Sequence, residues 1–287
     1  MFIGKIGATN TLATQARSFA TLKDISVRLK SVKNIQKITA SMKMVSAAKF
    51  NKAERELKPA KPYGLGASSF YVAAEIPKEE SPGLFIAVTS DRGLCGAANS
   101  SIAKAIREMK TKPENKDTKI VLIGDKSRAM LSRLHRNQFV LSFNEVGRKP
   151  ATFADASIIA QNLMALDNKF DQATLFYNKF QSVVSYSTTQ QPIFSQEKIM
   201  SSEKVALYDD VDDESMRSYN EFLLTSLIYY ALKEASCSEQ SARMTAMDSA
   251  TKNAGEMIGK LQLSFNRTRQ AAITRELTEI ISGAAAV

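Results

Sequence analysis

Apolar residues recur at helical spacing along the first part of the chain. Successive members of this stripe are three or four residues apart, as on one face of an α-helix. The stripe comprises Leu22, Ile25, Leu29, Val32, Ile35, Ile38, Met42 and Val45. No proline precedes Pro59, and no glycine lies between positions 8 and 63. The pattern predicts one helix from about Leu22 to Lys58 that Pro59 and Pro62 end, which is about 55 Å at 1.5 Å per residue.

A second, longer helical pattern runs from about Glu214 to Ser282, and no proline follows Pro192. Its apolar stripe comprises Met244, Met247, Ala250, Ala254, Ile258, Leu261, Phe265, Ala272 and Ile280. A continuous helix here would measure on the order of 100 Å, a length typical of a coiled coil or shaft. Gly255 and Gly259 would let another helix approach closely. If the chain leaves along one rod and returns along the other, the two rods are antiparallel.

Residues 63–213 between the rods alternate between strand and helix patterns. Leu84–Thr89 and Ile120–Ile123 are continuous apolar runs typical of buried strands. Further strands are predicted at Gln138–Phe143, Ala173–Tyr177 and Val183–Ile193, and helices near Ala97–Lys110, Lys126–Arg136 and Phe153–Leu166. This alternation predicts an α/β domain with a largely parallel sheet. Residues 200–213, polar and acidic, would connect it to the second rod.

The chain therefore divides into four predicted parts. They are residues 1–19, an N-terminal coiled-coil helix over 20–62, an α/β domain over 63–213, and a C-terminal coiled-coil helix over 214–287. Residues 1–19 contain Lys5 and Arg17 but no acid, which is typical of a mitochondrial transit peptide. A secretory signal fits less well because no continuous apolar region of adequate length is present. We expect the mature chain to begin near Ala20.

The net charge of +10 is concentrated near the N-terminus. Residues 20–61 hold eleven lysines or arginines against three acids, whereas residues 62–287 are balanced. A local excess of this kind indicates an acidic partner. Nucleic acid is a weaker alternative, because aromatic residues are absent from Leu22 to Lys49 and no recognition motif is present. No apolar run is long enough to predict a transmembrane helix.

One segment, Ser90-Asp91-Arg92-Gly93-Leu94-Cys95-Gly96, is the best candidate for chemistry. It follows a predicted strand and precedes a predicted helix, where α/β folds often bind phosphate. It lacks both G-x-G-x-x-G and the Gly-Lys-Ser/Thr of a P-loop, so a tight turn is the simpler interpretation. The only histidine, His135, lies on another predicted helix, which argues against Cys95 as a nucleophile.

The remaining polar clusters do not predict a catalytic or metal site. Glu276 and Glu279 lie one turn apart on a predicted helix, and a solvated face explains them. Asp209, Asp210, Asp212 and Asp213 do not have the spacing of an EF-hand. Cys95 and Cys237 are far apart and are read as reduced, partly buried thiols. We therefore expect no metal and no cofactor.

Several motifs resemble those of the ATP synthase γ subunit family. Residues 273–286, Ile-Thr-Arg-Glu-Leu-Thr-Glu-Ile-Ile-Ser-Gly-Ala-Ala-Ala, match its C-terminal signature at every defined position. Residues 266–271 (NRTRQA), 242–248 (ARMTAMD) and 35–45 (IQKITASMKMV) are similar to further family segments, and Ser90–Gly96 is similar to its central-domain motif. The resemblance covers essentially the whole mature chain, and its motifs occur in the family's order.

This resemblance implies an antiparallel coiled coil of the N- and C-terminal helices with an inserted Rossmann-like α/β domain. The family's shaft turns inside a hexamer of three α and three β subunits and has no catalytic site of its own. It couples proton flow through the membrane sector to ATP synthesis on the β subunits. The implied partners also include the δ and ε subunits and the c-ring, at the matrix side of the mitochondrial inner membrane, peripheral to the membrane.

The resemblance also implies roles for single residues. Contacts with the α and β subunits fall to Met42, Lys43, Arg243, Arg269, Gln270, Thr274 and Glu276. The final apolar segment, Ile280–Val287, would sit in a hydrophobic bearing. Two other functions stay open from the residues alone. One is a coiled-coil interaction protein without a rotary role, and the other is a small-molecule enzyme that uses Ser90–Gly96.

Overall fold

The computed structural model describes residues 21–77, 82–146, 149–166, 170–205, 208 and 212–285. The predicted transit peptide, Asp209 and Asp210 lie outside these ranges. The chain divides into two compact units. The sheet unit comprises residues 38–251, and the two-helix unit comprises the described residues up to Lys37 together with those from Lys252. Each unit is described by itself.

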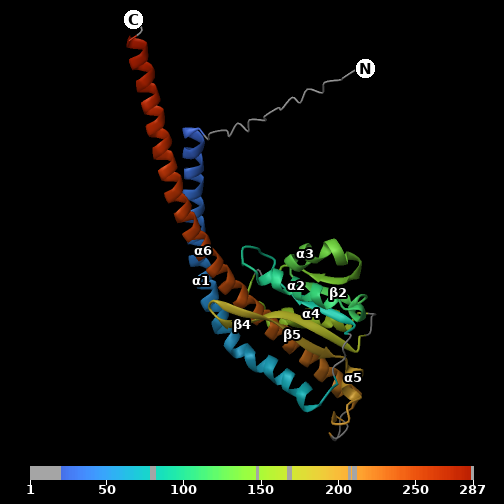
Figure 1. Cartoon of the computed structure of the whole chain (residues 1–287). Helices are drawn as coiled ribbons and strands as arrows, with labels where there is room; N and C mark the ends of the chain where they lie inside the picture. Colours follow the sequence, from blue (N-terminus) through green and yellow to red (C-terminus); the bar gives the residue numbers. More distant parts are fainter. Residues whose placement is uncertain are drawn as a thin grey trace, which may run out of the picture. The chain divides into compact units, whose positions relative to one another are not determined.

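Helix α1 spans Leu22–Ala73 and is longer than the sequence predicted (Figure 1). Pro59 and Pro62 lie inside it, so the prediction that they end the helix is wrong. Both prolines are exposed, and solvent can therefore bond the carbonyls that their missing N–H groups leave free. The opposite side of the helix is buried, with Leu57 and Ala60 almost inaccessible. Packing of that side outweighs the lost helical bonds.

The buried side of α1 in the sheet unit also differs from the predicted stripe. Ile38 and Val45 are exposed, whereas the polar Thr39 and Ser46 are buried. The buried positions keep a heptad spacing along the rest of the helix, at Thr39, Ser46, Phe50, Leu57, Ala60, Ala67 and Tyr71, and Ala74 directly after the helix continues the pattern. Thr39 can occupy this seam because its hydroxyl accepts a hydrogen bond from the Thr251 hydroxyl at 2.8 Å. Polar pairing thus fixes the register where the apolar pattern alone misleads.

Helix α6 spans Asp213–Ala285, which is about 110 Å at 1.5 Å per residue. From Leu223 to Glu234 every residue except Tyr229 is buried, so this stretch is enclosed by the rest of the sheet unit. Gly64 of α1 lies so close to Tyr230 that an added Cβ would come within 2.2 Å of its ring. The absence of a side chain at Gly64 therefore allows the two helices to pack here.

The central sheet has the strand order β3-β2-β1-β4-β5. All neighbours are parallel except β4 and β5, which form an antiparallel hairpin. The strands are β1 (Leu84–Val88), β2 (Lys119–Ile123), β3 (Phe139–Phe143), β4 (Gln172–Ser182) and β5 (Ser185–Phe194). The helices between them are α2 (Ala98–Lys110), α3 (Asp125–His135), α4 (Phe153–Met164) and α5 (Gln196–Met200), with short 3-10 turns at Pro113–Asn115 and Arg136–Gln138. The predicted α/β domain with a largely parallel sheet is confirmed.

Helices cover both faces of this sheet. Alternate residues of β1, such as Phe85 and Ala87, pack with Ile102 of α2 and Leu131 of α3. Ile86 and Val88 belong to the larger cluster that contains residues of α1, α4 and α6. This alternation follows from the two-residue period of a strand. The apolar runs are continuous because both faces are buried.

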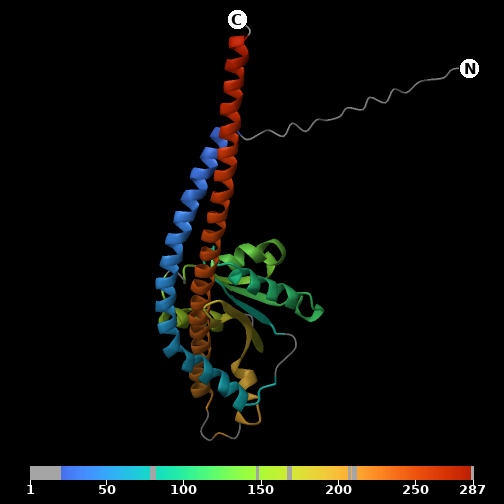
Figure 2. The same cartoon turned by 60° about the vertical axis from the view of Figure 1, so that its left-hand side comes forward.

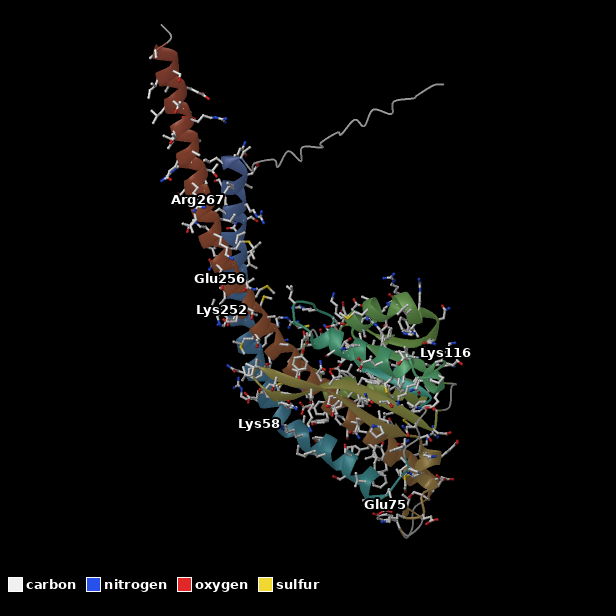
Figure 3. The ribbon with its side chains drawn as sticks, in the orientation of Figure 1. Lys58, Glu75, Lys116, Lys252, Glu256 and Arg267 are labelled. Carbon is white, nitrogen blue, oxygen red and sulfur yellow. The ribbon has the colours of Figure 1, made fainter. Side chains whose placement is uncertain are left out.

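The two-helix unit contains the start of α1 and the end of α6, which lie side by side and antiparallel in both views (Figures 1 and 2). Ile25, Val32 and Ala254 are buried between them, and Gly255 comes close to Gln36. Figure 3 labels Lys252, Glu256 and Arg267 on this part of α6, and all three are exposed. From Ile273 to Ala285 every residue is exposed. No described helix is both long and apolar enough to cross a membrane.

Candidate functional site

The Ser90–Gly96 loop follows β1 and is held by Asn99, a buried residue at the start of α2. The Ser90 backbone N–H donates to the Asn99 Oδ1 at 3.0 Å, and the Asn99 Nδ2 donates to the Ser90 Oγ at 2.9 Å. Two residues of the loop, Leu94 and Gly96, have φ values of 62° and 56°. Such values are uncommon for leucine, and the surrounding bonds maintain the conformation.

The same loop and Thr89, the residue before it, cap helix α3. The Asp125 backbone N–H donates to the Asp91 Oδ1 at 3.1 Å, and the Ser127 N–H donates to the Thr89 Oγ1 at 3.1 Å. A helix N-terminus attracts anions because its first N–H groups are unpaired. Here, side chains of the chain already accept two of these N–H groups. Gly124 precedes the helix with φ of 99° and lies against Thr89, where a Cβ would come within 2.3 Å of the Thr89 carbonyl oxygen.

Arg243 of α6 fastens the loop from the other side. Its Nε and Nη2 donate to the Gly93 carbonyl at 3.4 and 3.3 Å, and Nη2 also bonds the Glu239 carboxylate. The Arg243 and Glu239 side chains are only 9% and 13% exposed. Burial raises the pKa of Glu239, and the charge of Arg243 opposes that rise. We call Arg243, Glu239 and the Gly93 carbonyl the arginine latch.

Helix α6 fills the place where an α/β sheet usually binds a ligand. That place is the crevice at the carboxyl ends of the strands where the strand order reverses, here between β1 and β4. Leu232, Ala235 and Glu239 of α6 line the remaining cavity, which measures about 40 Å³. Small-molecule sites commonly occupy about 300–1,000 Å³. The geometry therefore does not favour a nucleotide-binding enzyme at Ser90–Gly96.

Neither cysteine lies in a setting that activates a thiol. Cys95 is buried, and its sulfur accepts a bond from the Asn99 Nδ2 at 3.1 Å. Burial raises the pKa of Cys95, and it raises the pKa of Cys237 to about 12. His135 lies at the end of α3, and burial lowers its pKa. Within the described ranges no group of three metal-ligating side chains comes together.

The residues predicted to contact α and β subunits differ in their exposure and lie in both units. Met42 is half-buried, and Lys43 is exposed and forms an ion pair with Asp248 at 2.6 Å. In the two-helix unit the exposed members are Arg269, Gln270, Thr274 and Glu276, and the Thr274 hydroxyl donates to the Gln270 carbonyl at 2.9 Å. Arg243 differs from the others because it is buried and bonded inside its own chain. The contacts with partners stay predictions.

Sequence reasoning missed three residues that organise this region. Glu239 lies four positions before Arg243, an acid–base spacing that a helix brings together, so that signal was available. Asn99 gave no local signal, because a loop separates it from Ser90. Asp248 was identified only as part of the 242–248 segment, because its partner Lys43 lies far away in the sequence.

Comparisons with known proteins agree with this architecture. A profile of the ATP synthase family matches residues 21–287. The mitochondrial ATP synthase subunit gamma of Drosophila melanogaster is 58% identical over 279 residues, which are 96% of this chain and 94% of that protein. The mitochondrial ATP synthase F(1) complex subunit gamma of Rattus norvegicus is 54% identical, over 93% of this chain and 100% of that protein.

Solved structures show the same fold. A chain from the central stalk and c-ring of the Tetrahymena thermophila mitochondrial ATP synthase is 26% identical, with a TM-score of 0.63 over 74% of this chain and 99% of that one. A chain from the rotor of the Euglena gracilis mitochondrial ATP synthase has a TM-score of 0.75 at 16% identity, covering 88% and 98% of the two chains. The resemblance seen in the motifs is confirmed, and this chain belongs to the ATP synthase gamma subunit family.

Proposed function

We propose that this chain is the central rotating shaft of a mitochondrial F-type ATP synthase and that it couples proton flow to ATP synthesis on other subunits. Family membership supports the role, and the exposed end of α6 is the observation that carries it. Ile273, Leu277, Ile280 and Ile281 are each about half exposed or more. A stretch of helix with this much apolar surface favours an enclosing partner.

The chain performs this task without a catalytic site. A shaft that presents different faces to three equivalent subunits changes the relative free energies of their conformations, which is coupling between sites on different chains. The filled crevice beside β1 and β4 and the unactivated cysteines support a non-catalytic role. The catalytic groups would then belong to the β subunits.

Exposed charged residues suit contacts that form and break during rotation. Lys43 and Arg269 would meet acidic loops of β, while Met42, Gln270, Thr274 and Glu276 would complete the contacts with α and β. Exposed ion pairs contribute about 0–1 kcal/mol each, so they would not hold the shaft at one angle. We assign Arg243 instead to the arginine latch, because its guanidinium is already buried and bonded within the chain.

The rest of the proposed assembly rests on the family resemblance. We infer that the chain associates with three α and three β subunits, with the δ and ε subunits and with the c-ring. It would be peripheral to the inner membrane on the matrix side, after removal of residues 1–19. The predicted bearing contact of Ile280–Val287 includes Ala286 and Val287, which lie outside the described residues.

Gentle affinity purification of the tagged chain from mitochondria tests the role, with stoichiometry and ATPase activity read on the same sample. We expect one copy of the chain with three copies of each of two larger ATPase subunits. Recovery of a homo-oligomer without ATPase activity would instead favour the coiled-coil interaction protein.

A charge reversal tests the contacts. Arg269→Glu should lower ATP-driven proton pumping relative to ATP hydrolysis and leave the helicity of the isolated chain intact. Lys112→Glu, an exposed reversal in the loop after α2, is the matched control and should leave pumping unchanged. Normal pumping by the Arg269→Glu complex would contradict the assignment of this residue.

A further inference from the structure

We propose that three polar side chains of α6 fix the β4–β5 hairpin to this helix, so that the sheet turns together with α6. They are Glu234, Ser238 and Ser241, and we call them the hairpin clamp. Their positions are four and three residues apart, which places them on one side of the helix. All three lie within the sheet unit and are at most 3% exposed.

The hairpin extends beyond the part of the sheet where β1 is its neighbour (Figure 1). The pairing of β1 with β4 runs from Ala173 to Phe176 of β4, whereas the pairing of β4 with β5 continues to Ser182. Asn178 and Phe180 lie past the last residue of β4 that pairs with β1. The edge of a strand presents backbone N–H and C=O groups that destabilise the fold if they are buried without partners.

Helix α6 supplies partners to this edge. The Phe180 backbone N–H donates to the Glu234 Oε2 at 2.8 Å, and the Ser238 Oγ donates to the Asn178 carbonyl at 3.0 Å. Asn178 and Phe180 are two positions apart, so their backbone groups point to the same side of β4. Ser241 completes the clamp by donating to the carbonyl of Val183 in the turn. Side chains of a helix thus take the place of a neighbouring strand.

Helix α1 contacts the same part of the hairpin through an apolar side chain. The Phe50 ring lies 5.5 Å from the Phe180 ring, and Phe50 is buried. Apolar contact of this kind is non-directional, so it resists separation of the hairpin more than sliding. The hydrogen bonds of the clamp are directional and fix the position of the hairpin along α6. We therefore assign resistance to sliding and twisting to the clamp.

The consequence for the shaft rests on the proposed function. Torque on the sheet reaches α6 through the contacts between them, and directional bonds yield less than apolar contacts alone. Removal of the clamp should therefore make the shaft easier to twist. The three residues are not among those assigned to contacts with α and β, so assembly should be preserved.

Hydrogen exchange on the isolated mature chain tests the clamp without reference to rotation. Ser238→Ala with Ser241→Ala removes both hydroxyl donors and keeps good helix formers at both positions. Ser218→Ala, an exposed change on the same helix, is the matched control. We expect the amides of residues 177–189 to exchange about tenfold faster in the double variant than in the control, a factor typical of lost hydrogen bonds. Equal exchange in the two would overturn the clamp.

Two variants of Glu234 test the third member of the clamp. Glu234→Gln keeps an oxygen that can accept the Phe180 N–H, whereas Glu234→Leu removes that oxygen at a similar size. The Phe180 amide should therefore exchange faster in Glu234→Leu than in Glu234→Gln. The same rate in both variants would overturn the role of Glu234.

Single-molecule measurements on the assembled complex test the role in rotation. A probe is attached through Lys112→Cys, an exposed position of the sheet unit, while the α and β subunits are fixed and rotation is paused. The native cysteines are buried, so the probe is directed to the new thiol. We expect a wider spread of probe angles with Ser238→Ala and Ser241→Ala than with Ser218→Ala.

The outcomes separate this inference from the proposed function. Equal spreads of angle, together with faster exchange of the hairpin amides, would overturn the role of the clamp in rotation. Absence of rotation with the probe-bearing chain that lacks the serine changes would contradict the proposed function instead. The hydrogen-exchange result would still decide whether the clamp fixes the hairpin, because that measurement needs the chain alone.

Discussion

If the arginine latch holds the sheet unit together, removing the Arg243 charge should lower the free energy of unfolding of the isolated chain. This effect distinguishes a structural role of Arg243 from a role in partner contact. Arg243→Met keeps most of the length of the side chain and removes its charge. The change leaves the Glu239 carboxylate buried at 13% exposure without its cation, and the Gly93 carbonyl loses both guanidinium bonds. Removing one partner of a buried pair costs about 3–5 kcal/mol. Because the two bonds to Gly93 are long, we expect a loss near the lower limit, about 3 kcal/mol at neutral pH.

The loss should depend on pH with a definite sign. Burial already raises the pKa of Glu239 above its ordinary value of 4.5, and loss of Arg243 raises it further. A group whose pKa is higher in the folded protein stabilises the fold below the unfolded pKa and loses this contribution as the pH rises. The penalty in Arg243→Met should therefore shrink on acidification, as Glu239 becomes neutral.

Urea unfolding of the isolated chain, followed by circular dichroism at neutral and mildly acidic pH, measures both effects. Arg269→Met is the control, because an exposed helical arginine should change the free energy of unfolding by no more than about 0.5 kcal/mol. The double variant Arg243→Met with Glu239→Gln should recover part of the loss, since no buried charge remains. A loss in Arg243→Met as small as that of the control would refute the latch. It would return Arg243 to the set of partner contacts.

Three further predictions concern the buried parts of the sheet unit. Gly64→Ala should lower the free energy of unfolding in urea by about 2–3 kcal/mol, because the added Cβ would meet the Tyr230 ring. Gly66→Ala, which has open space around it, should instead stabilise α1 by about 0.5–1 kcal/mol. Equal effects of the two changes would contradict this packing. Cys95 and Cys237 should resist a thiol reagent in the folded chain and react after unfolding, because burial raises the pKa of both thiols. Rapid modification of either cysteine in the native chain would argue against their burial. Burial also raises the pKa of Tyr177 to about 12, as it does for Cys237, so both groups favour the folded chain only while they are neutral. The urea concentration at the unfolding midpoint should therefore fall as the pH rises from 9 towards 12, and it should fall less in Cys237→Ala. A midpoint that does not change over this pH range would exclude the linkage.

The sequence alone determined the order and type of the elements. Continuous apolar runs such as Leu84–Val88 identify strands buried on both faces, and the scarcity of proline and glycine outside the centre predicts two long helices. These are local properties of the chain. The motifs from Ile35 to the C-terminal signature were equally readable, and they identified the family before any contact was known. The sites of partner contact could be placed only through that resemblance.

The tertiary structure decided what local patterns could not. Helix α1 continues through Pro59 and Pro62 because its opposite side is buried, which no propensity reveals. Thr39 rather than Ile38 enters the seam because its hydroxyl finds Thr251, a partner that lies far along the chain. Arg243 likewise points inward because the Gly93 carbonyl, 150 residues away in the sequence, accepts its bonds. In each case the free energy of a long-range contact exceeds a local preference, and such contacts exist only once the chain has folded.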